Sequence, residues 1–340
     1  MAMKTDNELV NRTIDTLLSV TEGADFIKVI SAKDDVKLMV GEHEFNITSV
    51  KSVTTGSKGL IINSIKAANK NGISATVLIA DYIPLEIAKE FKSLGMNYID
   101  SSGNTFLMNK DLCIYISGQK RIKATQTHKS RAFQESGIKL ILGLVSNPDL
   151  IESSYRSISE TVGISLASVA YVMQELTELN FILKTNDKKV LKNKKDLVNR
   201  WVVAYHDALR PRLLKRKMRF VDKSKYADWK NITLNDSKEI NTLWGGEPGA
   251  AILTNFLKPM IFTIYTTKSW QECAKEFGLV PDENGDVVIL QMFWKLISPS
   301  EKNRAIVPPV LIYADLINSS NDRNVETAEI VFDNELQNFK

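Results

Sequence analysis

Six lysines lie close together in the sequence and could bind phosphate groups. They are Lys184, Lys188, Lys189, Lys192, Lys194 and Lys195. Lysine side chains neutralise the backbone phosphates of nucleic acids and release their counterions, which supplies most of the sequence-independent affinity. The type and spacing of these residues therefore indicate contact with a polyanion.

The distribution of charge along the chain agrees with this interpretation. The 340 residues include 44 Lys and Arg against 40 Asp and Glu, a net charge of +4. Between Lys120 and Tyr226 there are 22 basic and 10 acidic residues, a net charge of +12, so the remaining residues carry −8. Such asymmetry is typical of a nucleic-acid-binding module. A solvated basic face is the alternative.

A pattern of short helices precedes the lysines. An apolar stripe within residues 138–144 predicts a first helix that ends at Asn147. A second helix is expected to begin with a capping box at Ser157 and Glu160, in which each side chain satisfies a free backbone N–H.

The second helix is interrupted after a short run, which is typical of a helix-turn-helix. Gly163 absorbs the change of direction, and Ser165 can cap a third helix. The residues of this third helix expected to face the core are Val169, Val172, Met173, Leu176 and Leu179. Those expected to contact DNA bases are Ser165, Ser168, Tyr171 and Gln174.

A β-hairpin is predicted directly after the third helix. Residues 181–184 and 189–191 form its strands, and residues 185–188 form a polar turn. A hairpin in this place is the wing of a winged helix-turn-helix, and its lysines can reach phosphates beside the groove. The candidate phosphate contacts are Lys184, Lys188, Lys189 and Lys192. The same elements also serve as a dimerisation or docking module that does not touch DNA.

The residues before the basic segment predict an α/β domain with a mixed sheet. Apolar residues between Leu9 and Leu18 recur at helical spacing and indicate an opening helix that ends near Gly23. Further helices are expected at residues 60–68 and 84–94, and strands at residues 36–40, 45–47, 75–80, 97–100, 105–108 and 112–117. Residues 119–131 are polar and basic without apolar periodicity, so the first domain boundary is placed there.

The residues after Arg200 predict a third domain of α+β character. They contain amphipathic helices, a tight turn at residues 244–248 with Pro248 at the first position of the next helix, and a strand at residues 261–265. Glu247 argues against a phosphate held at that turn. The predicted fold class is therefore α+β with three domains, at residues 1–122, 132–196 and 197–340.

Other combinations of chemically reactive residues do not form a recognisable site. Asp315, Asp322 and Glu326 could be imagined as metal ligands, but Arg323 lies among them and favours caps or ion pairs. The histidines and cysteines are isolated from one another, and the cysteines are expected to be buried free thiols: His43, His128, His206, Cys113 and Cys273. No catalytic residue, metal or cofactor is predicted.

A second run of basic residues follows the expected helix around Trp201 and Tyr205. It could extend a basic surface beside the wing, or it could simply solvate a helix face. Its members are Arg210, Arg212, Lys215, Arg216, Lys217 and Arg219.

With these residues in view, the chain from about Ala75 to its end resembles the AbiEi-like antitoxins, transcriptional regulators of type IV toxin-antitoxin systems. The motifs that carry the resemblance are Tyr98 to Asp100 with Gly103 and Asn104, Tyr155 to Glu160 with Gly163 to Ser165, Asn199 to Trp201 with Tyr205 and Leu209 to Arg212, Trp244 to Gly249, Pro308 and Pro309, Tyr313 to Leu316, Asp322 and Arg323, and Glu326 to Ala328. The resemblance implies repression of the chain's own operon. It also implies counteraction of a nucleotidyltransferase-like toxin, without implying direct contact.

The resemblance further implies an N-terminal domain similar to the restriction-endonuclease fold. An active enzyme of that kind holds Mg²⁺ with a carboxylate followed by a Glu or Asp two residues before a Lys. Asp100 could supply the first carboxylate, but Asn109, Lys110 and Asp111 have the wrong order for the second group. We therefore expect a scaffold without catalytic activity.

The sequence predicts a cytoplasmic DNA-binding repressor and antitoxin whose partners are double-stranded operator DNA and, functionally, the toxin. No membrane partner is expected, because the start of the chain lacks a basic leader and no apolar run is long enough to span a bilayer. Two alternatives remain open, a Mg²⁺-dependent nuclease targeted by the winged helix and a docking adaptor without a DNA role.

Overall fold

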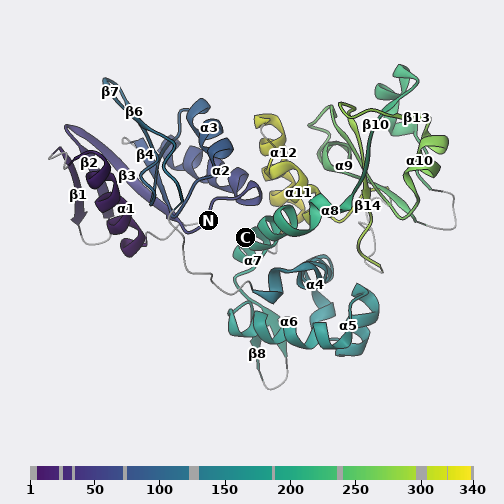
Figure 1. Cartoon of the computed structure of the whole chain (residues 1–340). Helices are drawn as coiled ribbons and strands as arrows, with labels where there is room; N and C mark the ends of the chain where they lie inside the picture. Colours follow the sequence, from purple (N-terminus) through teal and green to yellow (C-terminus); the bar gives the residue numbers. More distant parts are fainter. Residues whose placement is uncertain are drawn as a thin grey trace. The chain divides into compact units, whose positions relative to one another are not determined.

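The computed structural model divides the chain into two compact units, Met1–Thr127 and His128–Lys340, which are described separately (Figure 1). The structure describes residues 6–22, 26–32, 35–71, 75–121, 130–185, 188–235, 240–295, 305–319 and 321–337. Gly23, His128 and most of the predicted linker lie outside these ranges. None of the described helices is both long enough and apolar enough to cross a membrane.

The first unit is built on a seven-stranded mixed sheet. Its strands follow one another in chain order, β1 (Ile27–Ala32), β2 (Asp35–Val40), β3 (His43–Val50), β4 (Ala75–Ala80), β5 (Asn97–Asp100), β6 (Thr105–Asn109) and β7 (Leu112–Ile116). Strands β3, β4 and β5 are parallel, and the other neighbouring pairs are antiparallel. A mixed sheet was predicted, and its edge strand β1 was not among the predicted strands.

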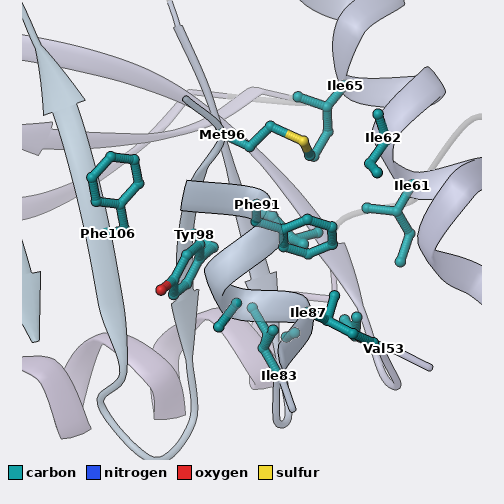
Figure 2. Packing of buried hydrophobic residues seen from close by; sticks show 13 residues of the cluster. Val53, Ile61, Ile62, Ile65, Ile83, Ile87, Phe91, Met96, Tyr98 and Phe106 are labelled. Atoms are coloured by element: carbon teal, nitrogen blue, oxygen red, sulfur yellow. The ribbon is translucent and has the colours of Figure 1, made fainter. Parts of the chain in front are cut away.

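Helices cover both faces of this sheet because the central strand β4 is apolar on both sides. Helix α1 (Asn7–Val20) packs with Val77 and Ile79 on one face. Helices α2 (Thr55–Asn71) and α3 (Leu85–Ser93) pack with Leu78 and Ala80 on the other. Figure 2 shows this second cluster, in which Phe91 of α3 is fully buried. A strand buried on both faces reads as a continuous apolar run, as residues 75–80 do.

The second unit begins with short helices and a hairpin. They are η1 (Arg131–Phe133), α4 (Glu135–Ser146), η2 (Pro148–Glu152), α5 (Tyr155–Val162), α6 (Leu166–Glu178), β8 (Ile182–Lys184) and β9 (Lys189–Leu191). These elements match the predicted sequence of helices and hairpin. The start of the second helix differs, because Ser154 is the N-cap and its side chain accepts a hydrogen bond from Ser157 N at 3.1 Å. The predicted capping box at Ser157 is therefore wrong.

A five-stranded sheet forms the centre of the remaining residues. Its strand order is β11 (Thr242–Gly245), β12 (Phe262–Thr266), β14 (Val287–Gln291), β10 (Leu214–Phe220) and β13 (Leu279–Pro281). Strands β12 and β14 are parallel, and the other neighbouring pairs are antiparallel. The mixed α+β character predicted for the C-terminal part is confirmed.

Helices connect and cover this second sheet. They are α7 (Lys194–Ala204), the π-helical turn η3 (Tyr205–Leu209), α8 (Arg210–Leu213), η4 (Lys223–Tyr226), η5 (Trp229–Asn231), α9 (Gly246–Thr254), α10 (Trp270–Phe277), α11 (Pro309–Ile317) and α12 (Asp322–Glu335). Helices α9, α11 and α12 pack against one another, and α10 packs against β10 and β13. The division of this unit into domains at residues 132–196 and 197–340 stays a prediction.

Two local expectations in these units are wrong. Helix α9 begins at Gly246, so Pro248 occupies its third position; the first-turn N–H groups are free in any helix, which makes proline acceptable there. Both cysteines are free, but only Cys273 is buried. Cys113 is exposed because the alternate residues of β7 point away from the core.

Candidate nucleic-acid interface

The turn between α5 and α6 has the local geometry that its sequence requires. Gly163 has φ of +78°, a left-handed conformation that glycine adopts without steric strain. The hydroxyl of Ser159 donates to the carbonyl of Ile164 at 2.6 Å. Ser165 caps α6, and its side chain accepts a hydrogen bond from Ser168 N at 3.1 Å. The direction of α6 is therefore set by several independent local contacts.

Helix α6 has a buried face and an exposed face. The buried side chains are Val169, Val172, Met173 and Leu176, as predicted, whereas Leu179 is only half-buried. On the same helix, the carboxylate of Glu175 accepts a hydrogen bond from Ala132 N at 2.8 Å, which joins α6 to η1. The orientation of the helix about its axis is fixed by this packing, so the opposite face is the surface available to a ligand.

The four predicted base-contacting residues lie on or beside this exposed face. Tyr171 has 58% of its surface exposed. Gln174 is exposed, and its Nε2 donates to Glu178 Oε1 at 2.9 Å. The hydroxyls of Ser165 and Ser168 lie 2.9 Å apart and bond to each other at the helix start. Tyr171 and Gln174 therefore lie on the exposed face and the two serines lie at the start of the helix, and the contact of all four with bases stays a prediction.

Two asparagines set the position of the hairpin. Asn180 and Asn193 both have positive φ, +60° and +48°, and asparagine tolerates this conformation better than most residues. Nδ2 of Asn193 donates to the carbonyl of Asn180 at 3.1 Å, which closes the base of the hairpin. The strands then pair with Lys184 opposite Lys189.

The lysines of the hairpin differ in their surroundings. Lys184, Lys188 and Lys192 are exposed. Lys189 is half-buried, with its ammonium group 5.1 Å from the centre of the Tyr155 ring and its backbone N–H bonded to Glu152. Three of the four predicted phosphate-contacting lysines are therefore exposed to solvent, and the ammonium group of the fourth makes a cation–π contact. Residues 186 and 187 at the tip lie outside the described residues.

One cation beside α6 does not appear among the predicted residues. Cζ of Arg131 lies 5.4 Å from the centre of the Tyr171 ring. The two residues are far apart in the sequence, so no local pattern indicates the contact. Arg131 therefore adds a positive charge beside the exposed face of α6. Arg156 on α5 is exposed as well.

The later basic run does not form one free surface. Arg210 pairs with Asp315, Arg219 Nε lies 3.3 Å from Asp282, and Arg216 lies over the Trp270 ring. Lys215 donates to a backbone carbonyl and is half-buried. These contacts favour a structural role for much of the run. Arg212 and Lys217 are exposed, and Nη1 of Arg212 lies 3.8 Å from Glu135 Oε2.

Asp100 of the first unit occupies a position unsuited to a metal ligand. The residue is 0% exposed. Its carboxylate accepts hydrogen bonds from the backbone N–H groups of Ile83, Ser102 and Asn104 at 3.0 to 3.2 Å, and from the Asn104 amide. Burial raises the pKa of this carboxyl, and the hydrogen bonds oppose the shift. All of its oxygen lone pairs have protein partners, which favours a structural role.

A buried polar network joins helices and sheet in the second unit. The carboxylate of Asp315 accepts hydrogen bonds from Arg210 Nε at 3.0 Å and from Tyr265 Oη at 2.9 Å, and Tyr205 Oη lies 3.3 Å away. Burial raises the pKa of both tyrosines well above the usual range. Within the described ranges, no group of three or more His, Cys, Asp and Glu residues is arranged to hold a metal ion.

Part of the chain matches the model of a known protein family. Residues 189–337 match the model of a family described as "Transcriptional regulator, AbiEi antitoxin, Type IV TA system". The match covers less than half of the chain and begins at β9, so α4, α5 and α6 lie outside it. The expected resemblance is confirmed over these residues, and over residues 75–188 it stays a prediction. Comparisons with curated proteins and with solved structures give no match.

Proposed function

We propose, from the match of residues 189–337 to the AbiEi family of transcriptional regulators, that the chain is a DNA-binding repressor and the antitoxin of a type IV toxin-antitoxin system. In this proposal residues 132–196 are a winged helix-turn-helix, with α6 in the major groove and the β8–β9 hairpin as its wing. Residues 1–122 are an endonuclease-like scaffold without catalytic activity. Residues 197–340 carry the antitoxin function against a nucleotidyltransferase-like toxin.

The observation that carries the DNA-binding proposal is that the exposed residues of α6 from Leu166 to Gln174 carry no charge and are followed in the chain by exposed lysines. The exposed carboxylate of Glu178 lies one turn further along the helix. Residues 166–174 of α6 contain no charged side chain. The lysine-rich segment follows directly, and Lys184, Lys188 and Lys192 are exposed. Uncharged groups can approach base edges in a groove, whereas cations are suited to the phosphates on either side of it.

Fluorescence anisotropy with duplexes from the region upstream of the chain's own gene tests this proposal. We expect the full-length protein to bind one such duplex more tightly than a scrambled duplex of the same composition. The logarithm of the affinity should fall linearly with the logarithm of salt concentration. Lys184→Ala and Lys188→Ala should each reduce that slope by roughly one unit.

Lys275→Ala is a matched control, because Lys275 is an exposed lysine of the same unit on α10. It removes the same charge far along the chain from the hairpin and should leave the salt slope unchanged. Equal effects of all three variants would show a general charge effect. Absence of binding to every duplex at moderate salt would reject the repressor and favour a docking adaptor.

The antitoxin part of the proposal has a separate test. Co-expression with an adjacent nucleotidyltransferase-like gene should restore growth that this gene alone inhibits. A chain with Lys184→Ala and Lys188→Ala should still restore growth if residues 197–340 carry the neutralising function. Failure of the wild-type chain to restore growth would reject the antitoxin assignment and leave DNA binding untouched.

A further inference from the structure

The exposed face of α6 contains apolar residues beside the polar ones that the sequence analysis selected. Leu166 has 49% of its surface exposed, and Ala167 and Ala170 are exposed as well. Ala167, Tyr171 and Gln174 follow at helical spacing and share one side of the helix. This stripe lies opposite Val169, Val172, Met173 and Leu176, which pack into the core.

Small apolar side chains at this place have a specific counterpart in DNA. In the major groove only thymine presents a methyl group, and alanine methyls contact it. Alanine also lets the helix backbone approach the base edges closely, because its side chain ends at Cβ. Guanine, by contrast, is most often read by the paired donors of Arg or Lys. Residues 166–174 contain neither Arg nor Lys.

The carboxamide of Gln174 favours the same base pair. Gln174 can donate to N7 and accept from the N6 amino group of adenine. Its amide is bonded to Glu178 at 2.9 Å, an exposed contact on the same helix that can exchange for a base. The exposed alanine methyls and the Gln174 carboxamide are therefore suited to A·T pairs, whose two bases offer the thymine methyl and the adenine edge.

We propose that α6 reads thymine methyl groups through Ala167 and Ala170, so that the sites bound by this chain have an A·T-rich core. The proposal rests on the DNA-binding function proposed above and names the chemistry of its ligand. Exposed cations of α5 and the hairpin, Arg156, Lys184, Lys188 and Lys192, supply the charge complementary to the flanking phosphates.

Selection from a random 30-base-pair duplex pool on the full-length protein tests this inference. The enriched duplex is synthesised again with deoxyuridine in place of each thymidine in turn, which removes the methyl group and keeps the base pair. We expect the enriched site to be A·T-rich at its core. At one or two positions, loss of the methyl should weaken binding about fourfold, the effect of burying a single methyl group.

Variants of the helix assign the methyl contacts to residues. Ala170→Gly and Ala167→Gly should each make one position of the site insensitive to uracil. Ala67→Gly is the matched control, because Ala67 is an exposed alanine of α2 in the first unit and carries the same loss of helix propensity. It should leave the uracil profile unchanged.

The outcomes separate this inference from the function on which it rests. Failure to enrich any duplex would overturn the DNA-binding proposal together with the inference. Enrichment of a specific site whose affinity does not respond to uracil at any position, or whose core is G·C-rich, would overturn the methyl readout alone. The uracil series uses the wild-type protein, so it remains decisive if a glycine variant fails to fold.

Discussion

Arg210 Nε donates to Asp315 Oδ1 at 3.0 Å, and this ion pair joins α8 to α11 across 105 residues of sequence. The Asp315 side chain is 2% exposed and that of Arg210 is 32% exposed. Asp315→Ala removes the counter-ion and leaves a mostly buried guanidinium without its partner. We expect the free energy of unfolding in urea to fall by about 3 kcal/mol.

Tyr265→Phe serves as the control for this ion pair. It removes one of the hydroxyls that donate to Asp315 and keeps the aromatic ring in the core. A hydrogen bond to a carboxylate contributes about 2 kcal/mol, so the loss should be smaller than for Asp315→Ala, which removes the ion pair as well. Equal losses in the two variants would show that the charge pair is not the dominant interaction of the network.

His206 makes the stability of the second unit depend on pH. Its Nε2 lies 2.7 Å from the Ala314 carbonyl, which can only accept a hydrogen bond. Burial lowers the pKa of His206, with smaller opposing contributions from this bond and from Asp315. The unfolded chain then binds a proton near pH 6.5, while the folded chain does so only at lower pH. Stability is therefore full above pH 6.5 and is lost as the pH falls towards the folded pKa.

A comparison of urea denaturation at pH 7 and pH 5 measures this effect. His206→Gln keeps an amide donor near the Ala314 carbonyl and does not titrate. The variant should lose less stability than the wild type over this range. An identical pH dependence of the two proteins would assign the loss to other groups.

The sequence predicts the helices and strands well where burial alternates regularly. The helical spacing of apolar residues within 138–144 predicts α4, and the glycine at position 163 predicts the break between α5 and α6. The apolar residues before Lys184 predict strand β8. Six of the seven strands of the first sheet were predicted, most directly β4 from its continuous apolar run, whereas the edge strand β1 was not predicted. These signals are local, because the repeat of a helix or strand determines on which face of the element each residue lies.

Contacts between residues far apart in the chain could not be predicted from local sequence patterns. Arg131 lies against Tyr171, and Asp315 against Arg210, at sequence separations that no spacing rule connects. The cap at Ser154 was missed for a different reason. Ser157 and Glu160 match the capping-box sequence, whereas Ser154 is not followed by Glu or Gln at the required spacing. The helix nevertheless begins about one turn earlier, with Ser154 as its N-cap. The apolar part of the α6 surface was missed because exposed alanines resemble core residues in sequence.

Gly163 is expected to be essential for the angle between α5 and α6. A side chain at its φ of +78° brings Cβ close to the following carbonyl, which costs about 1 kcal/mol or slightly more for L-residues. Gly163→Ala should therefore reduce the free energy of unfolding by about 1 kcal/mol and weaken duplex binding further by tilting α6. Gly163→Asn should be milder, because asparagine tolerates the left-handed region. Equal stability of the alanine variant and the wild type would contradict the strained turn.

The nuclease alternative requires Asp100 as a metal ligand, but its carboxylate accepts hydrogen bonds from the surrounding backbone. The donors are the backbone N–H groups of Ile83, Ser102 and Asn104, and these bonds connect the end of β5 to the turn before β6. A carboxylate that holds a catalytic metal needs oxygen lone pairs directed at the ion. Here the donors occupy them.

Substitution of Asp100 separates the two roles. Asp100→Ala leaves three buried backbone N–H groups without an acceptor, and each unsatisfied group costs about 1 kcal/mol or more. We expect the thermal unfolding midpoint of the first unit to fall by several degrees, as followed by circular dichroism. The wild-type chain should show no Mg²⁺-dependent cleavage of supercoiled plasmid. Cleavage by the wild type that disappears in a stably folded Asp100→Ala variant would instead support the nuclease alternative.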